Sequence, residues 1–268
     1  MKRSATHNSI AAPHACGMGR KGRYLLGAAS VLLLFFIWWF VAWRIDEPVL
    51  LPTPSAVAKR LYAILGEGAI YESILFTLSR ISHGFFGGLL AGVLLALPAA
   101  VFPTAEIFLR PWFFTVKSIP VASFVVLAIV WVGEWQLSAL ISFLMVTPIV
   151  YHNLLEGLRH TSKDLSEMAD VLHLPFSRRL IYIYVPQVKP HLLSACRISL
   201  GLAWKAGVAA EMIAYPKGSI GELLQQTKWS LDTESLIAYT LLIVLMSFLF
   251  EKLLTACLSL GFRLWEKL

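Results

Sequence analysis

Apolar residues gather into long runs that short polar segments separate, and this pattern predicts membrane-spanning helices. The first run covers residues 24–43, YLLGAASVLLLFFIWWFVAW, and contains no charge. At a rise of 1.5 Å per residue this run is about 30 Å long, which matches the hydrocarbon core of a bilayer. Five further runs are long enough to span, so six helices are predicted, the others at residues 73–101, 111–132, 136–155, 192–214 and 235–258.

A cleaved signal peptide is the competing interpretation of the first run. Its apolar region would be about 7–15 residues long and would be followed by a small-residue cleavage site. The run here is longer and ends in the aromatic cluster WWFVAWR, which is typical of a membrane–water interface. We therefore predict a retained helix at residues 24–43, preceded by a polar tail at residues 1–23.

The segments between the runs complete the predicted organisation. Residues 44–72 form a segment in which Pro52 and Pro54 break any continuing helix and Ser55 caps a short amphipathic helix. Residues 73–258 form a core of five helices, which contains a long polar loop at residues 157–190 between the fourth and fifth runs. A short tail at residues 259–268 ends the chain.

Composition and charge support a membrane protein and set its orientation. Hydrophobic residues make up 57% of the chain and charged residues 15%, against about 25% charged in soluble domains. The net charge of +7 matches either a nucleic-acid binder or the Lys/Arg excess of cytoplasmic loops. The intervening apolar runs favour the second, so no nucleic-acid partner is predicted. Thirteen Lys/Arg lie on the side that includes the N-terminal tail and five on the other, which places both termini in the cytoplasm and the segment 44–72 outside.

The loop at residues 157–190 carries a pattern that a passive connector does not need. Its first part, residues 163–174, repeats apolar residues with helical spacing, so they share one face: Leu165, Met168, Ala169 and Leu172. Glu167 lies on the opposite face, and Pro175 ends this helix. A second short helix at residues 176–184 is predicted to stop at Pro186.

This loop resembles the EAA loop of permeases from ATP-binding cassette (ABC) importers. Glu167, Met168 and Ala169 take the Glu-Ala-Ala places, His173 falls where the family has Gly, and Pro186 ends the motif. The stretches LPTPSAV, TLSRISHGFFGGLLAGVLLAL, KSIPVASFVVLAIVWVG and ACRISLGLAWKAGVAAEMI resemble the same family in the same order, so the similarity covers about residues 51–262. It is nearest to permeases of nitrate, sulfonate, taurine and thiamine-precursor importers.

The resemblance implies an all-α membrane protein with six transmembrane helices and the type I importer permease fold. It implies a permease homodimer in the lipid of the plasma or inner membrane, two separate ATPase subunits, an extracytoplasmic solute-binding protein, and a small anion or a thiamine precursor as solute. The residues expected to contact the ATPase are Leu165, Glu167, Met168, Ala169, Leu172, His173 and Pro186. With His in the Gly place, the bend is expected to differ, with Pro175 making the turn.

Charges inside the runs are candidates for the translocation path. A Lys at the centre of a span costs about 2.5–3.5 kcal/mol on insertion scales, so Lys117, beside Ser118, and Lys205, near Glu211, call for an explanation. One interpretation places these residues beside the path of an anionic solute. The other has Lys117 snorkelling to the interface and Lys205 pairing with a carboxylate or facing a partner subunit. Both stay open.

Other motifs narrow the function. Gly84, Gly88 and Gly92 form a GxxxG pattern that favours close helix packing, within the subunit or between two copies. The sequence has no G-x-x-x-x-G-K-[ST] loop, no HExxH and no CxxC, so we predict no cofactor, no metal and no enzymatic activity, with ATP hydrolysis in another subunit. An ion-gradient-driven secondary transporter is the alternative, although such proteins usually have more spans in repeated halves. An intramembrane enzyme would need a catalytic pair that the spans lack.

Overall fold

The computed structural model describes residues 20–160 and 163–265, and in these ranges the regular structure is helical, without strands. The chain divides into two units, residues 1–56 and 57–268. In the first unit, α1 (Arg20–Ile45) contains the apolar stretch Tyr24–Ile45, of which only 6% is buried. The Trp38 indole donates a hydrogen bond to the Pro52 carbonyl over 3.1 Å. A helix that is apolar on all sides suits a lipid environment.

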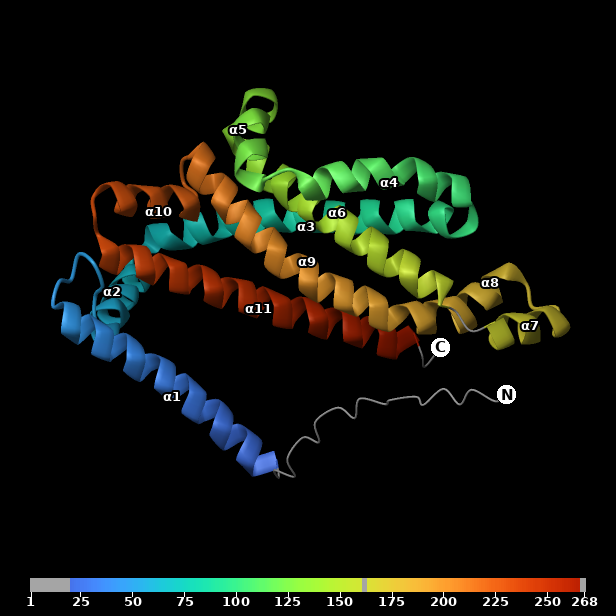
Figure 1. The fold of residues 1–268 in the computed structure, drawn as a ribbon, viewed down its shortest axis with the longest axis horizontal. Helices are drawn as coiled ribbons and strands as arrows, with labels where there is room; N and C mark the ends of the chain where they lie inside the picture. Colours follow the sequence, from blue (N-terminus) through green and yellow to red (C-terminus); the bar gives the residue numbers. More distant parts are fainter. Residues whose placement is uncertain (1–19, 161–162, 266–268) are drawn as a thin grey trace, which may run out of the picture. The chain divides into compact units, whose positions relative to one another are not determined.

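Three long helices form the centre of the second unit (Figure 1): α3 (Gly68–Val101), α6 (Glu134–Arg159) and α9 (Val185–Ala214). Their facing side chains are almost fully enclosed, including Ile81, Phe85, Ile141, Val146 and Leu200, each 0–1% exposed. The last helix, α11 (Thr233–Trp265), runs alongside them, yet only 6% of its most apolar stretch is buried. This helix therefore leaves most of its surface to lipid or to another chain.

Glycines allow α3 and α6 to approach closely. A Cβ added to Gly84 would lie 2.2 Å from the Ala139 carbonyl oxygen, and one added to Gly88 would lie 2.8 Å from the Phe143 oxygen. At Gly92 the added atom would lie 2.7 Å from the Val150 Cβ. The four-residue glycine spacing of α3 thus packs against α6 within the same subunit.

The third predicted run is not one straight helix. It is divided into α4 (Pro103–Ser118) and α5 (Val121–Val132), whose axes differ by 103°. Pro120 explains the break, because proline lacks an N–H and disfavours helical geometry at Ile119, whose φ of −74° and ψ of 127° are extended. Arg159 at the end of α6 forms a two-pronged ion pair with Glu106 of α4, so α4 is held against α6.

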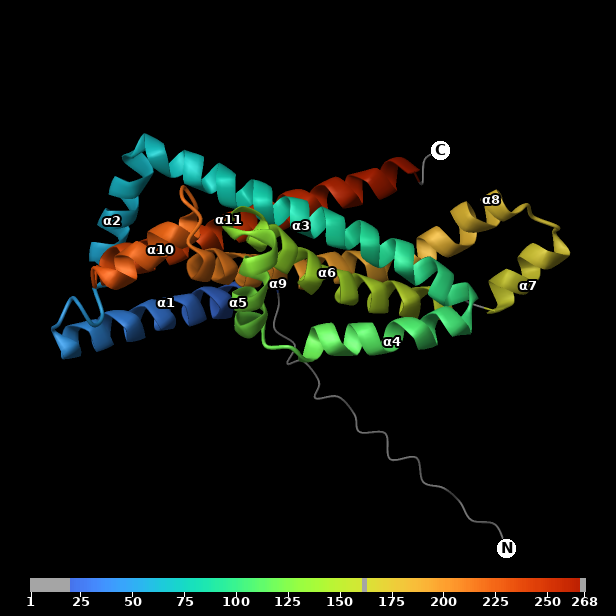
Figure 2. The same cartoon turned by 90° about the horizontal axis from the view of Figure 1, so that it is seen from above.

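The remaining helices lie at opposite ends of the long ones (Figures 1 and 2). One end carries α2 (Pro54–Gly66) and α10 (Ile220–Trp229), and the other carries α7 (Lys163–Val171) and α8 (Phe176–Arg179). Five described helices are long and apolar enough to span a membrane, or six if α4 and α5 count as one broken span. The other five predicted runs agree in place with Tyr24–Ile45, Gly68–Val101, Glu134–Arg159, Tyr182–Ala214 and Thr233–Gly261.

Candidate functional site

The bend after α7 keeps the backbone geometry of a glycine although histidine occupies it. His173 has a φ of +48°, in the left-handed region. The Leu174 amide donates to the Ala169 carbonyl over 3.0 Å and the His173 amide to the Asp170 carbonyl over 3.1 Å, the hydrogen bonds that close a helix through a left-handed residue. The expectation that His173 changes the bend and that Pro175 replaces it is therefore wrong: the turn is made at His173.

The apolar face of α7 is open. Met168 is 52% exposed and Leu172 58%, and Leu165 is exposed as well, whereas Ala169 is fully buried. Glu167 is also exposed on α7. Asp170 pairs with Arg179 of α8, so the two short helices are tied together across the bend. The segment from α7 to α8 thus presents three large apolar side chains, Leu165, Met168 and Leu172, that residues 20–160 and 163–265 leave exposed.

The helix after the bend does not stop at Pro186. The chain continues from α8 through a π-helical turn, Leu180–Tyr184, directly into α9, whose second residue is Pro186. The predicted end at this proline is therefore wrong. Proline lacks an N–H and its ring normally clashes with the preceding helical turn, and the wider π turn before Pro186 makes room for the ring. The α7–α8 hairpin is consequently joined to the long α9 by helical backbone.

The structure separates the residues predicted for the path. Lys117 and Ser118 are exposed at the end of α4, beside the 103° break, and the Ser118 hydroxyl donates to the Phe114 carbonyl over 2.8 Å. Lys205 is exposed on α9 and lines a pocket of about 530 Å³ between α9 and α11, together with Thr240, Ser247 and Glu251.

Glu211, in contrast, is enclosed and 1% exposed. Its Oε2 accepts hydrogen bonds from the Thr77 hydroxyl over 2.8 Å and from the Gly221 amide over 3.4 Å. The Thr77 hydroxyl in turn accepts from the Ile220 amide over 3.1 Å. A Cβ on Gly221 would lie 2.3 Å from the Glu211 Cβ. This carboxylate therefore joins α3, α9 and the start of α10.

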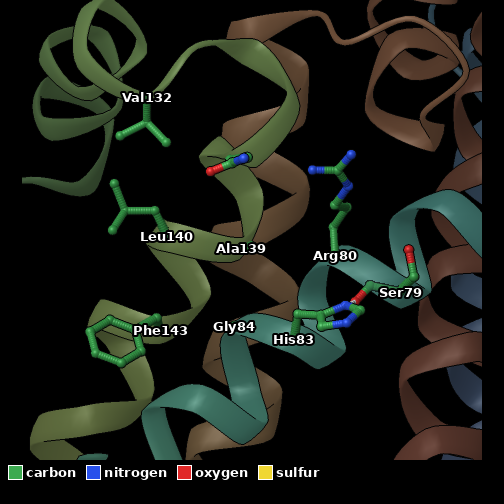
Figure 3. Close-up of a pocket in the computed structure, with 9 residues that line it drawn as sticks. Ser79, Arg80, His83, Gly84, Val132, Ala139, Leu140 and Phe143 are labelled. Atoms are coloured by element: carbon green, nitrogen blue, oxygen red, sulfur yellow. Dashed lines mark hydrogen bonds between the residues drawn. The ribbon is translucent and has the colours of Figure 1, made fainter.

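A second pocket lies between α3 and α6 and contains residues that sequence reasoning did not assign (Figure 3). Its volume is about 640 Å³, and Arg80 and His83 of α3 and Gln136 of α6 are among its lining residues. The signal was present in the sequence, because Ser79, Arg80 and His83 fall on adjacent positions of one face inside an apolar run. Among the described residues, no group of three or more His, Cys, Asp or Glu could hold a metal ion.

Membrane-length helices around a close-packed core, with an exposed amphipathic hairpin at one end, are typical of a multi-pass membrane protein. The chain belongs to the family of binding-protein-dependent transport system inner membrane components, whose sequence model matches residues 88–257. It is thus a multi-pass inner-membrane permease subunit of the type I ABC importer family, as its sequence motifs predicted.

Three relatives illustrate the similarity. The chain is 27% identical to the taurine transport system permease protein of Escherichia coli (strain K12), over 87% of this chain and 86% of that protein. It is 24% identical to a Bacillus subtilis (strain 168) protein assigned as an aliphatic sulfonates transport permease, over 82% and 80% of the two chains. It is 27% identical to a bicarbonate transport system permease protein of Synechococcus elongatus, over 70% and 72%.

Proposed function

We propose that this chain forms the translocation path of an ABC importer for a small oxyanion, most simply an organic sulfonate. Two copies would pair in the membrane, bind two separate ATPase subunits and receive solute from an extracytoplasmic binding protein. Family membership supports the transport role. The names of the relatives, which include taurine and sulfonate permeases, support the class of solute, since both kinds of solute carry an SO₃⁻ group.

The open apolar face of α7 carries the coupling part of this proposal. Leu165 and Met168 of the nine-residue α7, and Leu172 directly after it, are 39–58% exposed, and so short a helix is not stable alone in water. An exposed apolar cluster of this kind marks a docking surface. An ATPase groove would cover it, Glu167 and His173 would lie within reach of the same partner, and α9 would carry the motion into the membrane through the segment that contains Pro186.

In this scheme Lys117, Ser118 and Lys205 remain candidates for the path, because an exposed cation at membrane depth attracts an anion. Glu211 would act at the path only after a rearrangement, since the described conformation encloses it. A cytoplasmic position for the α7–α8 hairpin follows from the Lys/Arg bias of the sequence.

The decisive experiment reconstitutes the chain with and without its co-expressed ATPase and binding protein, and measures [³⁵S]taurine uptake into vesicles. Uptake that requires ATP and the ATPase supports an importer, whereas uptake by the purified chain alone, driven by an ion gradient, would establish the secondary transporter instead. Met168→Asp should abolish co-purification of the ATPase. Leu231→Asp, which changes a leucine that is 69% exposed at the α10 end, is the matched control and should leave co-purification intact.

A further inference from the structure

We propose that the pocket between α3 and α6 is an anion subsite on the solute path, in which Arg80 binds the sulfonate group of an organic sulfonate and the α6 wall contacts its short carbon chain. This inference rests on the proposed function, and it assigns a binding role to Arg80 and His83, which lie in the family-like stretch TLSRISHGFFGG but which the sequence motifs gave no role. Figure 3 shows Arg80 extending from α3 into the space that faces Ala139 and Leu140 of α6.

Arg80 carries a positive charge inside the apolar helix α3. A guanidinium within an apolar span is costly unless it has a partner, and the ion pairs of the described residues, Arg159–Glu106 and Arg179–Asp170, do not include it. The Glu211 carboxylate attracts Arg80 from beyond ion-pair distance, and its Oε2 accepts from Thr77 and Gly221. Within the described residues, Arg80 therefore lies in this pocket without an ion-pair partner.

The guanidinium of Arg80 is held in place by one hydrogen bond and two aromatic rings. It donates one hydrogen bond to the Trp135 carbonyl, and it lies over the Phe76 ring at 5.1 Å and the Trp135 ring at 6.0 Å. These contacts fix the plane of the group while using only one of its five N–H donors. The remaining donors form a rigid fork, which is the arrangement that binds two oxygens of one oxyanion.

The lining of the pocket mixes polar and apolar groups. Gln136 of α6 offers amide N–H groups beside Arg80 of α3. The His83 ring lies at the same pocket, with its Nδ1–H donating to the Ser79 carbonyl over 2.6 Å. Leu140 and Phe143 of α6 present hydrocarbon. A bare inorganic anion would leave that hydrocarbon in contact with water, whereas an organic sulfonate offers an anionic group for the polar residues and a carbon chain for the apolar ones. The lining therefore favours an organic sulfonate as ligand.

A cysteine reporter in the pocket tests the subsite without depending on uptake. In the full complex in phosphatidylcholine nanodiscs, with Cys16, Cys196 and Cys257 replaced by serine, Ala139→Cys would be modified by an anionic or a cationic methanethiosulfonate. We expect Arg80→Gln to lower the anionic-to-cationic rate ratio about tenfold, the effect of removing one nearby positive charge. Ethanesulfonate should slow the anionic reagent when Arg80 is present and have no effect in Arg80→Gln.

The controls make each outcome decisive. Arg110→Gln removes an exposed arginine of α4 outside the pocket and should leave the rate ratio unchanged. Leu140→Cys serves as a second reporter should Ala139→Cys not assemble. Equal ratios in Arg80→Gln and the parent, or no protection by ethanesulfonate, would overturn the subsite. If phosphatidylglycerol in the nanodisc slows the anionic reagent and ethanesulfonate has no further effect, the pocket binds a lipid headgroup, and the sulfonate subsite is overturned.

The same preparation separates this inference from the proposed function. If the complex takes up taurine in an ATPase-dependent manner but ethanesulfonate does not change the reaction rate of the reporter cysteine, the importer function is supported and the subsite is overturned. If ethanesulfonate protects the reporter but uptake proceeds without the ATPase, the subsite stands and the importer fails.

Discussion

The α3–α6 pair and α7 both carry apolar faces, but only the pair covers its face within the chain. Along α3, Gly84, Gly88 and Gly92 are buried against α6. Ile81 lies against Gly207 of α9 and Phe85 against Phe250 of α11, with Ile81 and Phe85 both at 0% exposure. On α7 the apolar positions stay open, with Met168 at 52%. The same kind of sequence pattern thus has two outcomes. An apolar face that is covered within the chain stabilises the subunit. An apolar face that stays exposed is available to bind a partner.

The largest expected loss of stability comes from a substitution that forces α3 and α6 apart. In Gly88→Ala the new Cβ would lie 2.8 Å from both the Phe143 carbonyl oxygen and the Val146 Cβ, and a backbone oxygen cannot move aside alone. The helices would have to separate, at a cost of about 1–3 kcal/mol for overpacking. We expect a clear loss of folded protein after heating in detergent, measured by size-exclusion chromatography.

Gly87→Ala is the matched control on the same helix. Its Cβ would meet the Phe143 ring at 3.4 Å, an ordinary contact, and alanine favours helix over glycine by about 0.5–1 kcal/mol. The recovery of folded Gly87→Ala should therefore equal or exceed that of the parent. Equal losses in both variants would show that the loss does not come from forcing α3 and α6 apart.

A substitution on the exposed face of α7 should change transport rather than the stability of the subunit. Glu167→Lys reverses an exposed charge on α7, so the subunit should fold and insert as before. We expect ATP hydrolysis by the assembled complex to continue while ATP-dependent uptake falls severalfold, because the partner's polar groups would no longer match. Unchanged uptake with wild-type ATPase rates would show that Glu167 does not belong to the coupling surface. Loss of folded protein would show that Glu167 stabilises the subunit itself.

Hydropathy predicted the long helices well because their apolar length is a property of consecutive residues. It failed where one residue depends on its surroundings. Pro120 broke a run that looks continuous by composition, whereas Pro186, which looked like a stop, is accommodated by a π turn. The left-handed bend at His173 follows from hydrogen bonds that close α7. The pocket at Arg80 forms because α6 packs beside α3. The residues around Arg80 in the sequence do not show which helix will pack there.

A smaller loss is expected from a polar link inside the packed region. Thr77→Val keeps the shape of a fully buried side chain but removes the 2.8 Å bond to Glu211 and the 3.1 Å bond from the Ile220 amide. The Glu211 Oε2 keeps its bond from the Gly221 amide, so the Ile220 amide is the buried group left without a partner, and the packing of the helices is unchanged. One such group costs about 1–3 kcal/mol, so the melting temperature in nanodiscs should fall. Thr115→Val, an exposed site with one bond to the Pro111 carbonyl, should shift it much less.

The smallest effect, and of opposite sign, is expected at the end of the open helix. His173 holds a φ of +48°, which costs a side chain with a Cβ about 1–2 kcal/mol relative to glycine. His173→Gly should therefore stabilise the turn, less the entropy that glycine loses on folding, for a net gain below about 1 kcal/mol. Hydrogen exchange of the Leu174 amide, which bonds to the Ala169 carbonyl over 3.0 Å, should slow up to about fivefold. His173→Ala keeps the Cβ and should give no slowing. Faster exchange in His173→Gly would mean that the imidazole itself holds α7 against α8, and the open face would then be fixed by a side chain rather than by the backbone.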